Sequence, residues 1–169
     1  MAENVYIVGT GHDLQCGVNA TKDAVLAFKE EILRICAHYQ IEQLFEEMTI
    51  EGLAERNVQS TVCQQLDIDI PISHVDMSGN ERMSLSLTDS NAASWLFRLN
   101  ATSERTTTLR EIFHAVVGEV RERVWVARIL AKGKYPVLLI CGATHAKSVC
   151  DILKRLEVKT RILHYDYGV

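Results

Sequence analysis

Two histidines occupy matching positions in this sequence, each three residues after a glycine that follows an apolar run. His12 follows Gly9, and His145 follows Gly142. A glycine lets the chain turn sharply as it leaves a strand, so both imidazoles are expected at one edge of a sheet. The pattern leaves two interpretations open: the pair belongs to a functional site, or the histidines only cap and pack the turns.

Carboxylates and an arginine are expected near this pair. Glu46 and Glu47 end a second apolar run, and Arg121 lies in a long helical stretch. Two imidazoles and one carboxylate, here His12, His145 and Glu47, can bind a divalent metal (manganese, cobalt, zinc or iron) that lowers the pKa of bound water. Without a metal, a histidine oriented by Glu46 or Glu47 can act as a general base on water. Both alternatives are hydrolytic chemistry, and the sequence does not separate them.

Arg121 itself has two interpretations. It shares one stripe of an expected helix at 106–132 with Arg110, His114 and Arg128. Such a stripe is commonly a solvated basic face. In the functional alternative, Arg121 turns toward the histidines and stabilises an anion or orients a carboxylate.

Apolar runs alternate with amphipathic stretches along the whole chain. Strands are expected at 5–8, 41–45, 68–77, 135–141 and 159–165, and helices at 22–39, 50–66, 106–132 and 146–156. The third strand is the weakest, because Pro71 is tolerated only at a sheet edge or a strand start. The alternation predicts one α/β domain over 1–169, with a mostly parallel central sheet of about five strands flanked by helices.

The segment 78–103 breaks this pattern. It is polar apart from an apolar cluster around Trp95 and Phe97. Its length and this cluster predict an insert that covers the site as a lid or forms a contact in a homodimer.

Composition narrows the classes of partner. The chain has 169 residues and a net charge of −4, which disfavours nucleic acid and anionic membranes. No apolar run reaches the roughly 18–20 residues of a membrane span, and the first residues lack a signal-peptide pattern. Five cysteines without a C-x-x-C pair argue against a disulfide framework or a zinc knuckle. We expect a cytoplasmic protein that acts on a small molecule or a peptide.

Three common catalytic motifs are missing from the sequence. Gly9-Thr-Gly11 lacks the third glycine of a dinucleotide fingerprint, and no G-K-[ST] sequence forms a P-loop. No serine stands in a G-x-S-x-G elbow. Nucleotide cofactors and covalent nucleophilic catalysis therefore have little support.

Four segments in this order resemble the TraB/TIKI group, which is related more distantly to the erythromycin-esterase and ChaN-like proteins. They are Val8-Gly-Thr-Gly-His12, Leu44-Phe-Glu-Glu-Met48, the helical stretch 121–129 that begins with Arg121, and Leu139-Ile-Cys-Gly-Ala-Thr-His-Ala146. The stretch 76–82 is similar to that of small stand-alone bacterial proteins.

The resemblance implies a hydrolase-like site. TIKI proteins are divalent-metal-dependent proteases, and the esterase relatives use histidine and glutamate to activate water. Carried over by position, His12 and His145 are the paired histidines, Glu46 or Glu47 is the carboxylate, and Arg121 is the helix arginine. The expected function is hydrolysis of a peptide, ester or related bond, metal-assisted or with water activated by histidine and glutamate. The alternatives are a non-catalytic module that binds a small ligand or a metal on the same fold, and a regulatory interaction protein.

Overall fold

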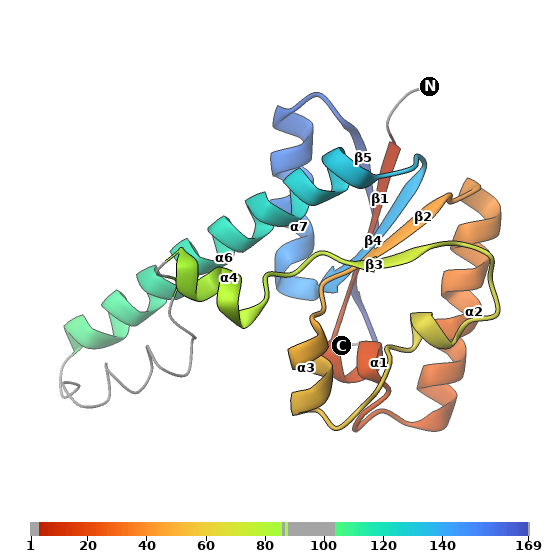
Figure 1. Cartoon of the computed structure of the whole chain (residues 1–169), viewed down its shortest axis with the longest axis horizontal. Helices are drawn as coiled ribbons and strands as arrows, with labels where there is room; N and C mark the ends of the chain where they lie inside the picture. Colours follow the sequence, from red (N-terminus) through yellow and green to blue (C-terminus); the bar gives the residue numbers. More distant parts are fainter. Residues whose placement is uncertain (1–3, 86, 88–103, 169) are drawn as a thin grey trace.

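Five parallel strands form the centre of the structure (Figure 1). The computed structural model describes residues 4–85, 87 and 104–168. Within them the sheet has the order β3-β2-β4-β1-β5, and every neighbouring pair is parallel. The strands are β1 (Asn4–Thr10), β2 (Gln43–Glu46), β3 (Ile72–His74), β4 (Val137–Gly142) and β5 (Lys159–Tyr167). The predicted α/β fold with a parallel sheet of five strands flanked by helices is confirmed.

Three longer helices cover the two faces of the sheet. The helix α2 (Lys22–Tyr39) packs on one face, and α6 (Glu104–Lys132) and α7 (Ala143–Arg155) pack on the other (Figure 1). Thr21 caps α2, because its hydroxyl accepts a hydrogen bond from the Ala24 N–H. Each face therefore has its own apolar core.

Consecutive strand residues enter opposite cores, because side chains alternate across a strand. In β2, Leu44 packs in the core with α2, whereas Phe45 packs in the core with α6 and α7. Leu138 and Leu139 divide in the same way in β4. This alternation also decides which way the polar residues at the strand ends point.

The predicted helix at 50–66 is wrong in length. The helix α3 (Ile50–Glu55) begins after Thr49, whose hydroxyl accepts a hydrogen bond from the Gly52 N–H. A 3-10 turn, η1 (Cys63–Gln65), follows separately. Asn57 has a φ of 55°, and a left-handed residue at this point ends an α-helix.

The third strand is also shorter than predicted. It spans Ile72–His74 rather than 68–77, and it forms the edge of the sheet directly after Pro71. The edge position agrees with the constraint that proline imposes, because proline has no N–H to donate to a neighbouring strand.

Two short helices were not predicted. The helix α1 (His12–Cys16) begins immediately after β1, and α4 (Gly79–Ser84) begins after Ser78, which forms a capping box with Glu81. Ser-x-x-Glu is a known helix-start signature, so α4 could have been expected from the sequence. Residues 88–103, including Trp95 and Phe97, lie outside the described residues, so the lid, insert or dimer contact at 78–103 stays a prediction.

The connections open a crevice at the carboxyl ends of β1 and β4. These two strands are neighbours in the sheet, yet β1 leads into α1 and α2 on one face and β4 leads into α7 on the other. In parallel α/β sheets, ligands bind where neighbouring connections diverge in this way. His12 and His145 stand on the two diverging segments.

The described helices and the five cysteines bear on the expectations about membrane spans and disulfide bonds. Among the described helices, none combines the length and the apolar composition that crossing a bilayer would need. The five cysteines are all buried and form no disulfide bond, as expected for thiols that pack as small apolar side chains.

The close approach of β1 and β5 gives the first testable prediction. A Cβ atom on Gly9 would lie 2.2 Å from the backbone oxygen of Tyr165, where the register of the two strands shifts. Gly9→Ala should therefore lower the free energy of unfolding by about 3 kcal/mol, because backbone atoms cannot move aside as a side chain can. Urea unfolding measures this change.

Gly79→Ala is the matched control, because a Cβ atom there meets nothing within 4 Å. A Gly9→Ala protein as stable as the Gly79→Ala protein would contradict the described packing of β1 against β5.

Candidate functional site

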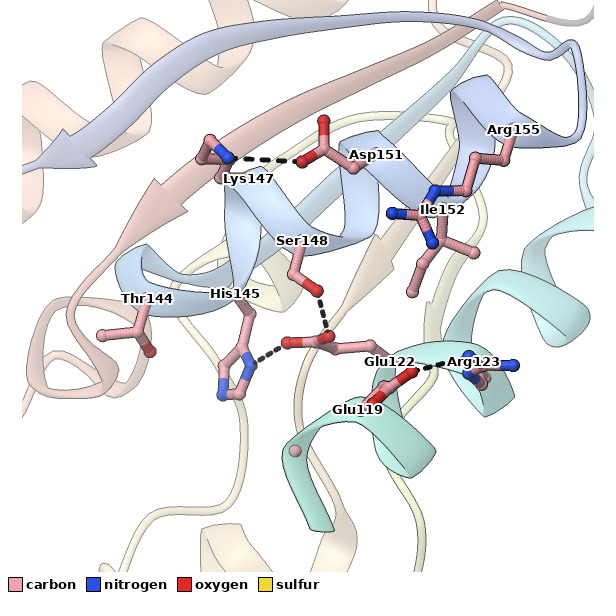
Figure 2. Close-up of a pocket in the computed structure, with 11 residues that line it drawn as sticks. Glu119, Glu122, Arg123, Thr144, His145, Lys147, Ser148, Asp151, Ile152 and Arg155 are labelled. Carbon is pink, nitrogen blue, oxygen red and sulfur yellow. Dashed lines mark hydrogen bonds and ion pairs between the residues drawn. The ribbon is translucent and has the colours of Figure 1, made fainter. Parts of the chain in front are cut away.

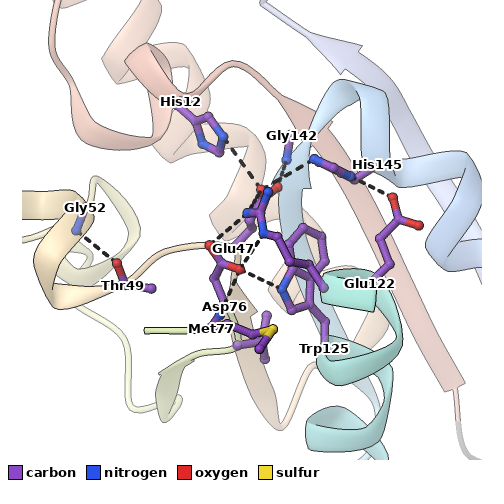
Figure 3. A network of polar contacts seen from close by, with 12 residues as sticks. His12, Glu47, Thr49, Gly52, Asp76, Met77, Glu122, Trp125, Gly142 and His145 are labelled. Carbon is purple, nitrogen blue, oxygen red and sulfur yellow. Dashed lines mark hydrogen bonds and ion pairs between the residues drawn. The ribbon is translucent and has the colours of Figure 1, made fainter. Parts of the chain in front are cut away.

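Three of the predicted site residues meet at the crevice (Figure 3). His12 Nε2 and His145 Nε2 each lie 3.7 Å from the same atom, Glu47 Oε1. His12 is the first residue of α1, His145 lies in the first turn of α7, and Glu47 directly follows β2. Three separate strand ends therefore bring two imidazoles and one carboxylate together.

Glu47 is the buried centre of this group, with 1% of its side chain exposed. The backbone N–H of Gly142 donates to Oε2 at 2.6 Å, and Arg121 Nη2 donates to Oε1 at 2.9 Å. A Cβ atom on Gly142 would lie 3.1 Å from Oε2, so a side chain at this position would crowd the Glu47 carboxylate. Both carboxylate oxygens are thus fixed by the protein.

Arg121 turns inward and links Glu47 to a second carboxylate. Its Nε and Nη2 atoms donate to the two oxygens of Asp76 at 3.0 and 2.8 Å. The indole N–H of Trp125 also donates to Asp76, at 3.0 Å, and the Arg121 guanidinium lies 5.2 Å from the Trp125 ring. The stripe of basic residues on this helix is therefore not a solvated face at Arg121, whose side chain is 19% exposed.

The charges of this pair outweigh the effect of burial. Burial raises the pKa of Asp76. The hydrogen bonds and the charge of Arg121 lower it by a larger amount, so the net pKa lies below the ordinary value. For Arg121, burial lowers the pKa, and the bonds to Asp76 and Glu47 more than compensate, so it is raised. Both groups are therefore ionised near neutral pH.

His145 is held by a carboxylate that the sequence analysis did not identify. Its Nδ1 lies 2.7 Å from Glu122 Oε1, and Ser148 Oγ donates to Glu122 Oε2 (Figure 2). Burial lowers the pKa of His145, but the Glu122 hydrogen bond and the Glu47 charge raise it, and the net pKa is raised. With Nδ1 bonded to Glu122, Nε2 is the ring nitrogen that faces Glu47.

His12 has a different environment. Its Nδ1 lies 2.8 Å from the side-chain oxygen of Gln15, and 37% of the side chain is exposed. The amide oxygen of Gln15 fixes the orientation of the ring. The two histidines are therefore matched in their distance to Glu47, but they differ in their Nδ1 partner and in their exposure.

Glu46, which the sequence analysis offered as an alternative to Glu47, lies outside this group of side chains. Alternation along β2 turns Glu46 to the side of Leu44 and α2, and turns Glu47 to the side of Phe45 and α6. Thr61 Oγ1 donates to Glu46 Oε2 at 2.6 Å, and the thiol of Cys63 also forms a hydrogen bond with this carboxyl group. Burial raises the pKa of Glu46 to about 7.

Four contributing residues were missed or not placed in the site by the sequence analysis: Gln15, Asp76, Glu122 and Trp125. Local spacing carries part of the signal. Gln15 lies three residues after His12 on one helix, and Glu122 directly follows Arg121. The partners of Asp76, Glu122 and Trp125 are known only once α6, α7 and the segment after β3 are placed side by side.

Two cavities reach the group from different sides. A cavity of about 150 Å³ is lined by His12, Glu47, Asp76 and Arg121, together with two further arginines, Arg56 and Arg82. A larger cavity of about 590 Å³ lies between α6 and α7, and its lining includes His145, Glu122 and Ser148 (Figure 2). Glu47 Oε1 lies between the histidine of the first cavity and the histidine of the second.

This arrangement suits a divalent metal poorly. The oxygen of Glu47 that faces both imidazoles already accepts a hydrogen bond from the positively charged Arg121, which repels a second cation. Among the described residues, no set of three or more histidine, cysteine, aspartate or glutamate side chains is arranged to hold a metal ion. The predicted metal, with His12, Glu47 and His145 as ligands, stays a prediction that the experiment under the proposed function addresses.

Comparison of the chain with protein-family models, with curated proteins and with solved structures gave no match.

The buried Glu46 carboxyl gives a prediction for stability. With a pKa of about 7 in the folded state and 4.5 as its ordinary value, the folded protein holds a proton that the unfolded chain releases. The stabilisation from this group is present below pH 4.5 and is lost as the pH rises toward 7. Glu46→Gln should remove this loss and gain up to about 3 kcal/mol over the wild type at pH 8.

Urea unfolding at about pH 4 and pH 8 measures the effect, with Glu42→Gln as a control at an exposed glutamate on the same segment. The assignment fails if the Glu46→Gln protein keeps the pH dependence of the wild type.

Proposed function

We propose that this protein is a hydrolase that activates water where His12, Glu47 and His145 meet. The observation that carries the proposal is the approach of two imidazole Nε2 atoms to one buried carboxylate oxygen, each at 3.7 Å. The resemblance of the G-x-x-H turns to the TraB/TIKI group supports a peptide, ester or related bond as the target. The net charge of −4 favours a small molecule or a peptide over nucleic acid.

The spacing is suited to a water molecule. A separation of 3.7 Å is too long for a direct hydrogen bond, but a single water about 2.8 Å from each atom can bond Glu47 Oε1 and an imidazole Nε2 together. Such a water would lie beside the carboxylate and next to a ring nitrogen with a free lone pair. It is therefore both oriented and next to a base.

His145 is the better base of the two histidines. Glu122 bonds its Nδ1 at 2.7 Å, which fixes the tautomer and stabilises the imidazolium that forms when Nε2 takes a proton. The water oxygen then forms a bond to the carbonyl carbon, whose π electrons move to the carbonyl oxygen. When the tetrahedral intermediate collapses, the bond to the leaving group breaks and His145 returns the proton to that group.

The remaining residues have supporting roles in this scheme. Arg121 and the Gly142 N–H hold Glu47 in place, and Asp76 holds Arg121. Arg121 is thus assigned a positioning role, since its bonds already go to two carboxylates of the protein. His12 is placed to bond the substrate or the water from the smaller cavity.

One observation favours a second candidate, a module that binds a small ligand without converting it. Both oxygens of Glu47 are already hydrogen-bonded within the protein, as in a rigid binding site. Such a module would show ligand-dependent melting but no product with any substrate.

The proposed mechanism predicts that substitutions at the adjacent residues Glu46 and Glu47 have different effects on kcat/KM. His145→Ala and Glu47→Gln should each lower kcat/KM by about 100-fold or more, because one removes the base and the other the carboxylate that orients the water. Glu46→Gln should keep the wild-type kcat/KM, since Glu46 faces the opposite side of the sheet. Turnover of a panel of aryl esters and dipeptides, with and without EDTA, measures these effects.

Full activity in both His145→Ala and Glu47→Gln would contradict the mechanism. Activity that EDTA abolishes, together with a stoichiometric metal lost in His12→Ala and His145→Ala, would replace it with the metal-assisted alternative.

A further inference from the structure

We propose that Arg56 and Arg82 form an anion subsite beside His12, so that the substrate carries a carboxylate or a phosphate group. This inference names a substrate class for the same site and therefore rests on the proposed function. It concerns the smaller cavity, of about 150 Å³.

Three arginines line this cavity, and they differ in their partners. Arg121 is neutralised by Glu47 and Asp76. Arg56 and Arg82 form no ion pair with any residue in the described part of the chain, although each is partly buried. Their charges are therefore available to a ligand.

The carboxylates of the cavity do not compete for these two arginines. Glu47 and Asp76 are both engaged by Arg121. The third, Glu55, is exposed to solvent, where water screens its charge. Two free guanidinium groups thus face a cavity whose buried acids are already paired.

Arg56 lines the same cavity as His12. It follows α3, and its Nη1 donates to the Gly52 backbone oxygen at 3.2 Å. Its charge also reaches α1, the helix that begins with His12: burial raises the pKa of Cys16, and the charge of Arg56 opposes that rise. Arg82 reaches the cavity from α4, on a separate segment.

The chemistry of the lining favours an oxyanion. Guanidinium groups donate paired N–H bonds to carboxylate and phosphate oxygens. A cavity of about 150 Å³ is smaller than the roughly 300 Å³ at which ligand sites usually begin, so it suits one end of a substrate.

Binding of inorganic phosphate and of acetate to the full chain tests this subsite directly. Wild-type protein should bind at least one of the two, and the bound anion should shift the NMR signals of the His12 imidazole. Arg56→Gln and Arg82→Gln should each weaken that affinity by about 10-fold. Arg34→Gln is the control, because Arg34 pairs with Glu31 on the surface of α2. The anion that binds more tightly distinguishes a carboxylate from a phosphate substrate.

Failure of wild-type protein to bind either anion would overturn the subsite, as would unchanged affinity in the Arg56→Gln, Arg82→Gln double variant. The proposed function fails separately. His145→Ala should keep anion affinity and lose turnover, whereas anion binding by a wild type that converts no ester or peptide would leave the subsite standing and remove the hydrolase.

Discussion

The burial of the Glu47 carboxylate is the constraint on which this site depends. A carboxylate removed from water is costly unless charge and hydrogen bonds compensate. Here the Gly142 N–H and the Arg121 guanidinium compensate, and Arg121 is in turn fixed by Asp76. Because the partners come from β4, α6 and the segment after β3, the carboxylate can be satisfied only when the sheet and its covering helix are assembled.

The same constraint makes the two histidines unequal. The carboxylates of Glu47 and Glu122 both lie beside the His145 imidazole. Burial and the charge of Arg121 lower the pKa of His145, but the hydrogen bond to Glu122 and the two carboxylate charges outweigh them, so the net pKa is raised. His12 is bonded to a neutral amide at the rim of the cavity. Two turns of the same sequence pattern therefore place one base in a buried charge cluster and one near solvent.

The fold and half of the site follow from local sequence patterns. Continuous apolar strands alternating with amphipathic helices predict the parallel sheet, and the G-x-x-H turns place both histidines at its carboxyl edge. The sequence could also have predicted that Glu46 and Glu47 face opposite sides of the sheet. Side chains alternate along a strand, so the alternation that sends Leu44 and Phe45 into different cores continues through the next two residues. What could not be predicted is pairing at long sequence separation: the contacts of Asp76 with Arg121 and of Glu122 with His145 depend on how α6 and α7 pack.

The measurement that tests the central claim most directly is the NMR titration of the His145 imidazole in the wild type and in matched glutamine variants. The wild-type imidazole should have a pKa above its ordinary value of about 6.5. This pKa should fall in both Glu122→Gln and Glu47→Gln and stay unchanged in Glu46→Gln. An ordinary pKa for His145 in the wild type, or one that responds to Glu46→Gln as strongly as to Glu47→Gln, would contradict the claim that Glu47 and Glu122 together hold a base at this edge of the sheet.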